Sequence, residues 1–310
     1  MLSRTDLSLV LMVAIWGTNF SVLKFAFREV PQQPFNAVRV ALAAVIFVVA
    51  MAVVQRRARR GATHSRLLFT HAPLDRHDLW ALIAIGLVGH FLYQLLFVGG
   101  VARTSVANAS LILGATPVCV ALASAALGRD RVRPMHWFGA AVSAAGIWTV
   151  VGSGADFGGE HLRGDLMVLG SVACWTVYTV GAGPLLTRHS PLYLTGVSMA
   201  IGATPYLLVT LPEVLQVDWT AVSAATWVAL VFSALFALCL SYVIWYGAVM
   251  KIGMAHTSIY SNLVPIAAMV VATLWLAEPL TGRKLIGAAL VLGGVALTRL
   301  RFQIATPAPE

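Results

Sequence analysis

The chain has 310 residues, of which 59% are hydrophobic and 11% are charged. Soluble domains carry about 25% charged residues, and no water-soluble core could bury this much apolar surface, so an ordinary soluble protein is excluded. The net charge of +9 is compatible with nucleic-acid binding. The positions of the basic residues relative to the apolar stretches argue against that function. The three cysteines lie in apolar stretches, without the spacing of a disulfide, metal or catalytic site.

Ten apolar stretches are each long enough, at about 20 residues, to cross a membrane as a helix. They are continuous rather than alternating, so strands are excluded. The stretches are residues 7–27, 35–54, 79–98, 105–127 and 135–151, then 166–186, 192–211, 227–247, 255–277 and 285–300. The first is too long for a secretory signal, so we expect it to remain as a helix. The predicted fold class is an all-α membrane protein with ten transmembrane helices.

The basic residues sort to one side of these stretches. With a cytoplasmic N-terminus, fourteen basic residues fall on the cytoplasmic side and five on the other. The positive-inside rule therefore predicts that both termini are cytoplasmic, in a multi-pass protein of a bacterial inner membrane. This topology explains the basic charge without nucleic acid. The loop 55–78 would also attract anionic lipid headgroups.

The two halves of the chain repeat each other. Asp6, Leu7, Ala14 and Trp16 recur 159 residues later as Asp165, Leu166, Ala173 and Trp175, and seven residues between Gly99 and Gly146 recur 148 residues later. Each half holds five stretches, an odd number, so the second half would enter the membrane from the opposite side. Inverted repeats are typical of transporters that alternate access to a central site. We expect a first repeat at 1–155, a second at 156–302 and a disordered tail at 303–310.

Several motifs across the whole chain carry a family resemblance. They are Ala14-Ile15-Trp16-Gly17-Thr18-Asn19-Phe20, Arg39, Pro117, Pro265, Glu278-Pro279, and Gly287, Gly293 and Gly294. With the repeat, they make the chain similar to the drug/metabolite transporter superfamily, specifically its ten-helix EamA-type exporters. The resemblance implies export of amino acids, other metabolites or toxic organic compounds, and is closest to aromatic amino acid exporters.

The chain also departs from the family pattern at two positions. Arg129-Asp130-Arg131 stands where the family commonly has a glutamate, and the second half has no arginine that matches Arg39. Neither position can therefore be assigned a role shared by both halves.

Polar side chains inside the stretches are candidates for a transport pathway, because they are costly in lipid. Three pairs of matched helices carry polar and aromatic residues at helical spacing. They are Trp16, Asn19 and Phe20 with Trp175, Tyr178 and Thr179; His90, Tyr93, Gln94 and Phe97 with Ser241, Tyr242, Trp245 and Tyr246; and Asn108 and Ser110 with His256, Tyr260, Ser261 and Asn262. We predict that these six helices surround a central cavity that binds the substrate. Pro117 and Pro265 are predicted to kink two of them.

Each of these residues also has a structural explanation. Tryptophan and tyrosine anchor helices at the membrane surface, and small polar side chains bridge neighbouring helices. The set as a whole favours a cavity, because matched positions in both halves are polar. His90 could serve substrate or protons, or could be a neutral ring bonded to a neighbouring helix. Lys24 and Arg39 could hold a substrate carboxylate, but snorkelling to headgroups is the favoured interpretation.

None of the twelve aspartates and glutamates lies at the centre of an apolar stretch. This limits both the residues that could couple transport to protons and the substrates that could bind. Only His90 and His256 could couple transport to protons, so we predict movement down a concentration gradient or weak coupling through His90. Small lipophilic cations are disfavoured as main substrates because no membrane carboxylate would balance their charge, although aromatic cages could still bind them by cation–π attraction. Aromatic walls with amides and hydroxyls suit aromatic amino acids, and equally nucleobases and many drugs.

Competing functions find less support in the sequence. A membrane enzyme would need paired carboxylates, an HExxH motif or a Gly-rich phosphate loop, and none is present. We therefore expect no catalytic residue, metal or cofactor. Nucleotide-sugar exchange would need more basic groups in the pathway to bind diphosphates. A structural or signalling role would not explain why the two halves form an inverted repeat. The expected partners are a small-molecule substrate and the lipid bilayer, with the chain acting as a monomer.

Overall fold

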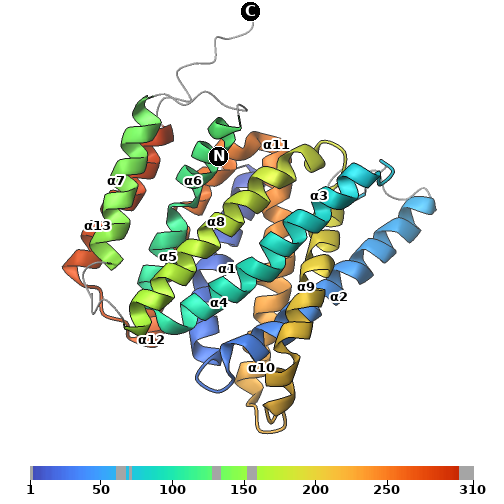
Figure 1. Cartoon of the computed structure of the whole chain (residues 1–310), viewed down its shortest axis with the longest axis horizontal. Coiled ribbons are helices and arrows are strands. Elements are labelled where there is room, and N and C mark those ends of the chain that lie inside the picture. The colour runs from blue at the N-terminus through green and yellow to red at the C-terminus, as the bar shows by residue number, and fades with distance from the viewer. Residues whose placement is uncertain (1–2, 61–67, 70–71, 128–133, 152–158, 300–310) are drawn as a thin grey trace, which may run out of the picture.

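The computed structural model describes residues 3–60, 68–69, 72–127, 134–151 and 159–299. Every regular element in these ranges is a helix, which confirms the predicted all-α class (Figure 1). The predicted boundary at 155–156 and the tail 303–310 lie outside the described residues. The helices of the first half are α1 (Arg4–Ala26), α2 (Gln32–Arg59), α3 (Arg76–Gly86), η1 (Leu87–Leu92), α4 (Tyr93–Arg103), α5 (Val106–Gly114), α6 (Thr116–Ala126) and α7 (Pro134–Val151).

The second half continues with the same kinds of element. These are α8 (Glu160–Leu186), α9 (Pro191–Gln216), α10 (Ala224–Phe232), η3 (Ser233–Leu240), α11 (Ser241–Ser261), α12 (Val264–Leu276) and α13 (Gly282–Arg299). Among the described residues, six helical runs are long and apolar enough to cross a membrane: Arg4–Ala26, Gln32–Ala58, Arg76–Arg103, Glu160–Leu186, Pro191–Gln216 and Ala224–Ile252. Two shorter apolar helices, Val106–Val120 and Val264–Leu276, accompany them.

Side-chain caps set where several helices begin. The hydroxyl of Ser3 accepts from the Asp6 N–H at 3.2 Å, and the Asp6 carboxylate accepts from the Ser3 N–H at 2.8 Å, which forms a capping box at the start of α1. Asp75, Ser105 and Ser223 cap α3, α5 and α10 in the same way, each with its side chain accepting an N–H three residues later. Polar residues at the ends of apolar stretches therefore fix the helix starts.

Two long helices contain π-helical segments at matched places. The first, η1, joins α3 to α4, and the second, η3, joins α10 to α11. Residues of η1 correspond to residues of η3 at the repeat spacing of 148. A π-helical turn shifts the side chains that follow it and is common at functional sites. Nothing in the apolar periodicity of the sequence marks these segments.

The fourth and ninth apolar stretches are each broken before a proline. α5 ends at Gly114, and Pro117 lies in the first turn of α6. Likewise Pro265 lies in the first turn of α12. Proline lacks an N–H and clashes with the preceding turn, so it favours a helix start, although α8 and α9 carry Pro184, Pro205 and Pro212 in their interiors. At both predicted kink positions the structure thus has a new helix.

The predicted gap between the eighth and ninth stretches is absent, because α11 continues across it to Ser261. In the first half the matched gap is present, since Thr104 is extended and Ser105 caps α5. The second half has Ile252 and Gly253 at these positions. Neither offers the hydroxyl that would cap a new helix, so the helix continues.

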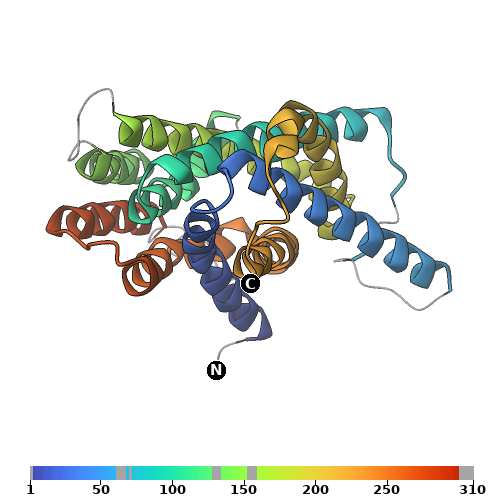
Figure 2. The same ribbon diagram turned by 90° about the horizontal axis from the view of Figure 1, so that it is seen from below.

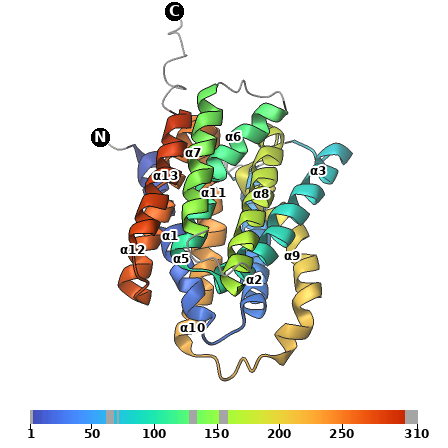
Figure 3. The same cartoon turned by 60° about the vertical axis from the view of Figure 1, so that its left-hand side comes forward.

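Helices of the two halves pack against each other throughout the bundle. The main pairs are α7 with α13, α2 with α9, α4 with α8 and α1 with α12, and the α7–α13 pair lies at one edge (Figure 2). At one end lie the α1–α2 connection and the start of α10, which we call the Glu29 end. At the other lie the starts of α1 and α3 and the α8–α9 connection, which we call the Arg188 end (Figure 3).

The α7–α13 contact gives a test of this packing. A Cβ atom at Gly294 would lie 2.4 Å from the Ser143 Oγ and 2.5 Å from the Gly139 carbonyl oxygen, whereas a Cβ at Gly293 would meet nothing within 4 Å. We predict that Gly294→Ala destabilises the protein by about 1–3 kcal/mol, because the two backbones must separate. Thermal unfolding in detergent measures this.

The matched control is Gly293→Ala, which should leave the melting temperature unchanged or raise it slightly, because alanine favours a helix. Equal melting temperatures for the two variants would contradict the close approach of α7 and α13.

Candidate functional site

Ten rings meet at the centre of the bundle, and we call this set the aromatic cluster. Its members are Trp16, Phe20, His90, Tyr93, Phe97, Trp175, Tyr178, Tyr242, Trp245 and Tyr246. The ring of Trp16 lies edge-on to Trp175 and to Tyr242, with 6.2 Å between centroids in each case. Trp16 and Trp175 are the pair that the repeat relates, so the two halves meet at this contact.

The other rings extend this contact in two directions. Tyr93 stacks on Phe97 at 5.4 Å between centroids and reaches Trp175 at the same distance. On the other side, His90 lies 4.8 Å from Tyr178. Edge-to-face and stacked pairs at these distances are favourable beyond the area they bury. The cluster therefore binds α1, η1, α4, α8 and α11 into one unit.

Backbone features hold these rings in place. A Cβ at Gly89 would lie 2.4 Å from the ring of Tyr178, so only glycine lets that ring pack against η1. The indole N–H of Trp16 donates to the carbonyl of Ala237 in η3 at 3.0 Å. Both π-helical segments therefore border the cluster, one beside Tyr178 and the other beside Trp16.

A chain of polar side chains runs beside the cluster, and we call it the polar chain: Gln94, Arg39, Ser233 and Asn19. Arg39 donates to the Gln94 Oε1 and to the Ser233 Oγ, each at 2.9 Å, and Ser233 donates to the Asn19 Oδ1 at 2.6 Å. Arg39 is only 1% exposed. The snorkelling interpretation of Arg39 was wrong, because its guanidinium points into the bundle.

Several buried polar atoms at this centre have no hydrogen-bond partner among the described residues. They are Arg39 Nε, Gln94 Nε2, Trp245 Nε1 and both ring nitrogens of His90. Most buried polar groups in proteins are paired, so a concentration of unpaired donors marks a place suited to a polar ligand. His90 accordingly lacks the bond to a neighbouring helix that was one interpretation of it.

The remaining predicted residues belong neither to the aromatic cluster nor to the polar chain. Asn108 donates to Asp165 at 3.2 Å, and Tyr260 donates to Asp6 at 2.8 Å. Asn262 lies in the turn before α12. The side chain of His256 lies outside the described residues. Ring contacts and hydrogen bonds thus connect twelve of the predicted substrate residues, whereas the hydrogen bonds of Asn108 and Tyr260 lead to the acids Asp165 and Asp6.

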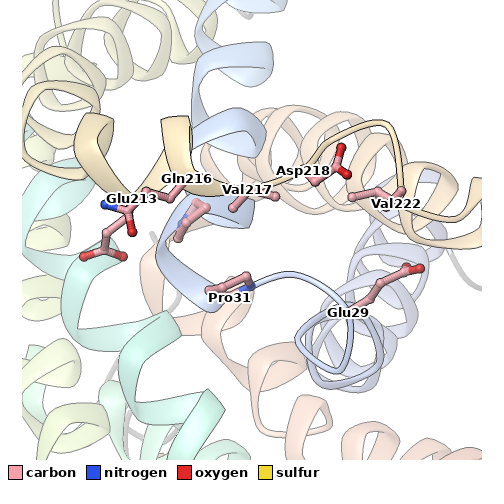
Figure 4. A pocket seen from close by; sticks show the side chains of 9 residues that line it. Glu29, Pro31, Glu213, Gln216, Val217, Asp218 and Val222 are labelled. Carbon is pink, nitrogen blue, oxygen red and sulfur yellow. The ribbon is translucent and has the colours of Figure 1, made fainter.

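Two cavities open at the Glu29 end. One of about 480 Å³ is lined by residues that include Glu29, Glu213 and Asp218 (Figure 4). The other, of about 330 Å³, lies beside Lys24 and Glu278. Neither is lined by the aromatic cluster. The rings of the cluster pack against one another, and the central cavity stays a prediction.

At the Glu29 end, one carboxylate joins the two halves. Glu29 accepts from the Ser223 N–H at 2.9 Å, from the Ser223 hydroxyl at 2.8 Å and from the Thr226 hydroxyl. These hydrogen bonds lower the pKa of Glu29, and the bond from Thr226 has the largest effect. The carboxylate is therefore ionised at neutral pH, and the contact weakens only as the pH falls through the lowered value. We call this the Glu29 contact.

At the opposite end, one arginine joins the halves. Arg188 donates to the Asp75 Oδ2 at 2.6 Å and lies 3.0 Å from the Asp78 Oδ2, while the buried His189 lies 2.7 Å from the same Asp78 oxygen. The backbone N–H of Asp78, and then Arg188, lower the pKa of Asp75. This Arg188 contact, like the Glu29 contact, was not foreseen from the sequence, since charged residues in short connections carry no distinctive pattern.

Comparisons with known proteins agree with this arrangement. The EamA-like transporter family matches residues 3–152 and again residues 162–300. The uncharacterized transporter YyaM of Bacillus subtilis is 27% identical, over 90% of this chain and 88% of its own. A probable terminal-alkyne amino-acid exporter of Streptantibioticus cattleyicolor is 27% identical, over 97% of this chain and 95% of its own.

A solved crystal structure shares the fold, with a TM-score of 0.65 and 21% identity over 98% of this chain and all of its own. Apolar helices that can cross a membrane several times, together with relatives named as transporters, show a multi-pass membrane transporter. Because the family match covers most of its length, the chain belongs to the EamA-like transporter family of the drug/metabolite transporter superfamily.

Proposed function

We propose that this transporter exports small organic metabolites, foremost amino acids with aromatic or apolar side chains. The observation that carries the proposal is the aromatic cluster with the polar chain beside it. Rings supply stacking for an apolar group, and unpaired donors supply hydrogen bonds for a polar group. A relative named as a probable amino-acid exporter is consistent with this substrate class. The working unit is one chain in a bacterial inner membrane, with both termini cytoplasmic.

The proposed mechanism is alternating access between two inverted repeats of five transmembrane helices. Helix starts support the repeat, because α2 and α9 begin 159 residues apart, at Gln32 and Pro191. The capping residues Asp75 and Ser223 are 148 residues apart. These are the two spacings at which the sequence repeats.

The contacts at the two ends support the same mechanism. Glu29 and Arg188 are 159 residues apart, and Asp75 and Asp78 precede Ser223 and Thr226 by 148. The Glu29 contact and the Arg188 contact are therefore one contact repeated at opposite ends, with donor and acceptor exchanged. In alternating access one would open while the other stays closed, so we assign them as the two gates of the transporter.

The proposed driving force is the concentration gradient of the substrate. His90 is fully buried, its ring contacts the rings of Tyr178 and Tyr242, and no ion pair joins it to an acid among the described residues. Adding a proton there would bury a charge without an acidic partner, which is unfavourable.

Flux into proteoliposomes tests the function. We predict uptake of radiolabelled tryptophan and phenylalanine, but not of threonine or adenine, without a pH gradient. Trp16→Ala and Trp175→Ala should each reduce this uptake at least tenfold, because both rings belong to the cluster. Trp148→Ala is the control, since Trp148 is 68% exposed on α7. Flux of adenine alone would contradict the amino-acid assignment, and flux that requires the gradient would direct attention to His90 and His256.

Labelling of Cys174 tests the gates. This thiol is 6% exposed and precedes Trp175 of the cluster, so a chain without Cys119 and Cys239 reports access to the centre. With a membrane-impermeant maleimide, we predict that Glu29→Gln speeds labelling from the Glu29 end and that Arg188→Gln speeds it from the Arg188 end.

The control for labelling is Arg163→Gln, which removes an exposed ion pair with Glu160 within α8 and should change neither rate. If Glu29→Gln and Arg188→Gln sped labelling from the same side, or from neither, the two contacts would not be gates.

A further inference from the structure

We propose that Arg39 binds the carboxylate of the transported molecule and that the site has no counterpart for an amino group. The substrate class would then be aromatic or apolar monocarboxylates in general, including amino acids but also acids that lack nitrogen. This inference rests on the proposed function, because it takes the aromatic cluster as the substrate site.

The first argument is the charge balance around Arg39. Its side chain is 1% exposed and is among the largest fully buried side chains. Its hydrogen-bond acceptors are the neutral Gln94 and Ser233, and no ion pair joins it to an acid among the described residues. A buried charge without an opposite charge is strongly unfavourable. An anionic ligand would relieve that cost.

The second argument is the set of free donors. The Nε atom of Arg39 and the Nε2 atom of Gln94 are buried without hydrogen-bond partners. Arginine carries five N–H donors in a planar fork, and a carboxylate can bind two of them at once. The two residues thus present several donors and a positive charge at one place, which is the chemistry that recognises a carboxylate.

The third argument is the position beside the rings. Gln94 lies one helical turn after His90, and Asn19 lies one turn after Trp16, so two members of the polar chain share a helix face with members of the aromatic cluster. A molecule with its carboxylate on Arg39 would therefore place an attached apolar group among these rings.

The fourth argument is that the charge is not needed by the fold. The repeat relates Arg39 on α2 to Ser198 on α9, 159 residues later, and Ser198 shares a hydrogen bond of 3.1 Å with Tyr178. The matched helix therefore packs with a small neutral residue at this place. An arginine that occurs in only one of the two repeats indicates a role other than helix packing.

Among the residues that the structure describes, an ammonium group finds no comparable partner. The three acids within ten residues of a cluster member in sequence have other partners. Glu29 accepts from Ser223 and Thr226, Asp6 bonds with Ser3 and Tyr260, and Asp165 bonds with Thr104 and Asn108. The faces of the rings could attract an ammonium group, but more weakly than a carboxylate would. The site thus recognises the carboxylate of an amino acid but provides no charged partner for its ammonium group.

Three indole compounds test the proposal with the full chain in proteoliposomes. Tryptophan carries both charged groups, indole-3-propionate only the carboxylate, and tryptamine only the ammonium. We expect flux of the first two and none of tryptamine. Arg39→Gln should reduce both fluxes at least tenfold, and Arg39→Lys should retain a part, because it keeps the charge but not the planar fork.

Lys24→Gln is the matched control, since Lys24 is a half-buried cation that donates to the backbone of Ala102 and lies outside the polar chain. It should leave both fluxes unchanged. Melting temperatures serve as the folding control, and removal of a lone buried charge should leave that of Arg39→Gln equal or higher.

The outcomes separate this inference from the proposed function. Tryptophan flux that Arg39→Gln leaves intact would overturn the role of Arg39 and leave an aromatic amino acid exporter. Flux of tryptamine equal to that of indole-3-propionate in the unsubstituted protein would overturn the carboxylate preference, even if Arg39→Gln failed to fold. Absence of all three fluxes would overturn the proposed function and, with it, this inference.

Discussion

A single buried positive charge organises the centre of this protein. Arg39 lies between a helix of the first half, through Gln94, and a π-helical segment of the second half, through Ser233, and the same serine reaches Asn19 on α1. Its neutral partners accept hydrogen bonds from some of the guanidinium donors, but they do not balance its positive charge. The aromatic cluster around it excludes water and strengthens any electrostatic interaction there. The hydrogen bonds of Arg39 thus join the two halves, while its charge remains available to an anionic ligand.

The two ends of the bundle repeat one contact with reversed chemistry. A carboxylate accepts from hydroxyls at the Glu29 end, and a guanidinium donates to carboxylates at the Arg188 end. Both contacts are formed in this structure, and the ring contacts of the aromatic cluster lie in the same bundle. The cavity beside Glu29 (Figure 4) lies at one of these two ends.

The sequence predicted the all-α class and every ring of the cluster, because apolar length and helical spacing are local properties. It did not predict the helix breaks before Pro117 and Pro265, nor the continuous helix through Ile252 and Gly253, since caps and prolines decide these points within one turn. The burial of Arg39 was also missed. Position near a helix end favours snorkelling, and only the packing of α2 against η3 and α4 shows where the side chain points.

The most direct test of the account is a structure of the protein in a lipid nanodisc with indole-3-propionate bound. The account predicts that the carboxylate contacts the Nε of Arg39 and that the indole ring lies between Trp16 and Trp175, which must move apart to admit it. If the ligand instead occupied only the cavity beside Glu29 and Glu213, with Arg39 still bound only to Gln94 and Ser233, the central claim would be wrong.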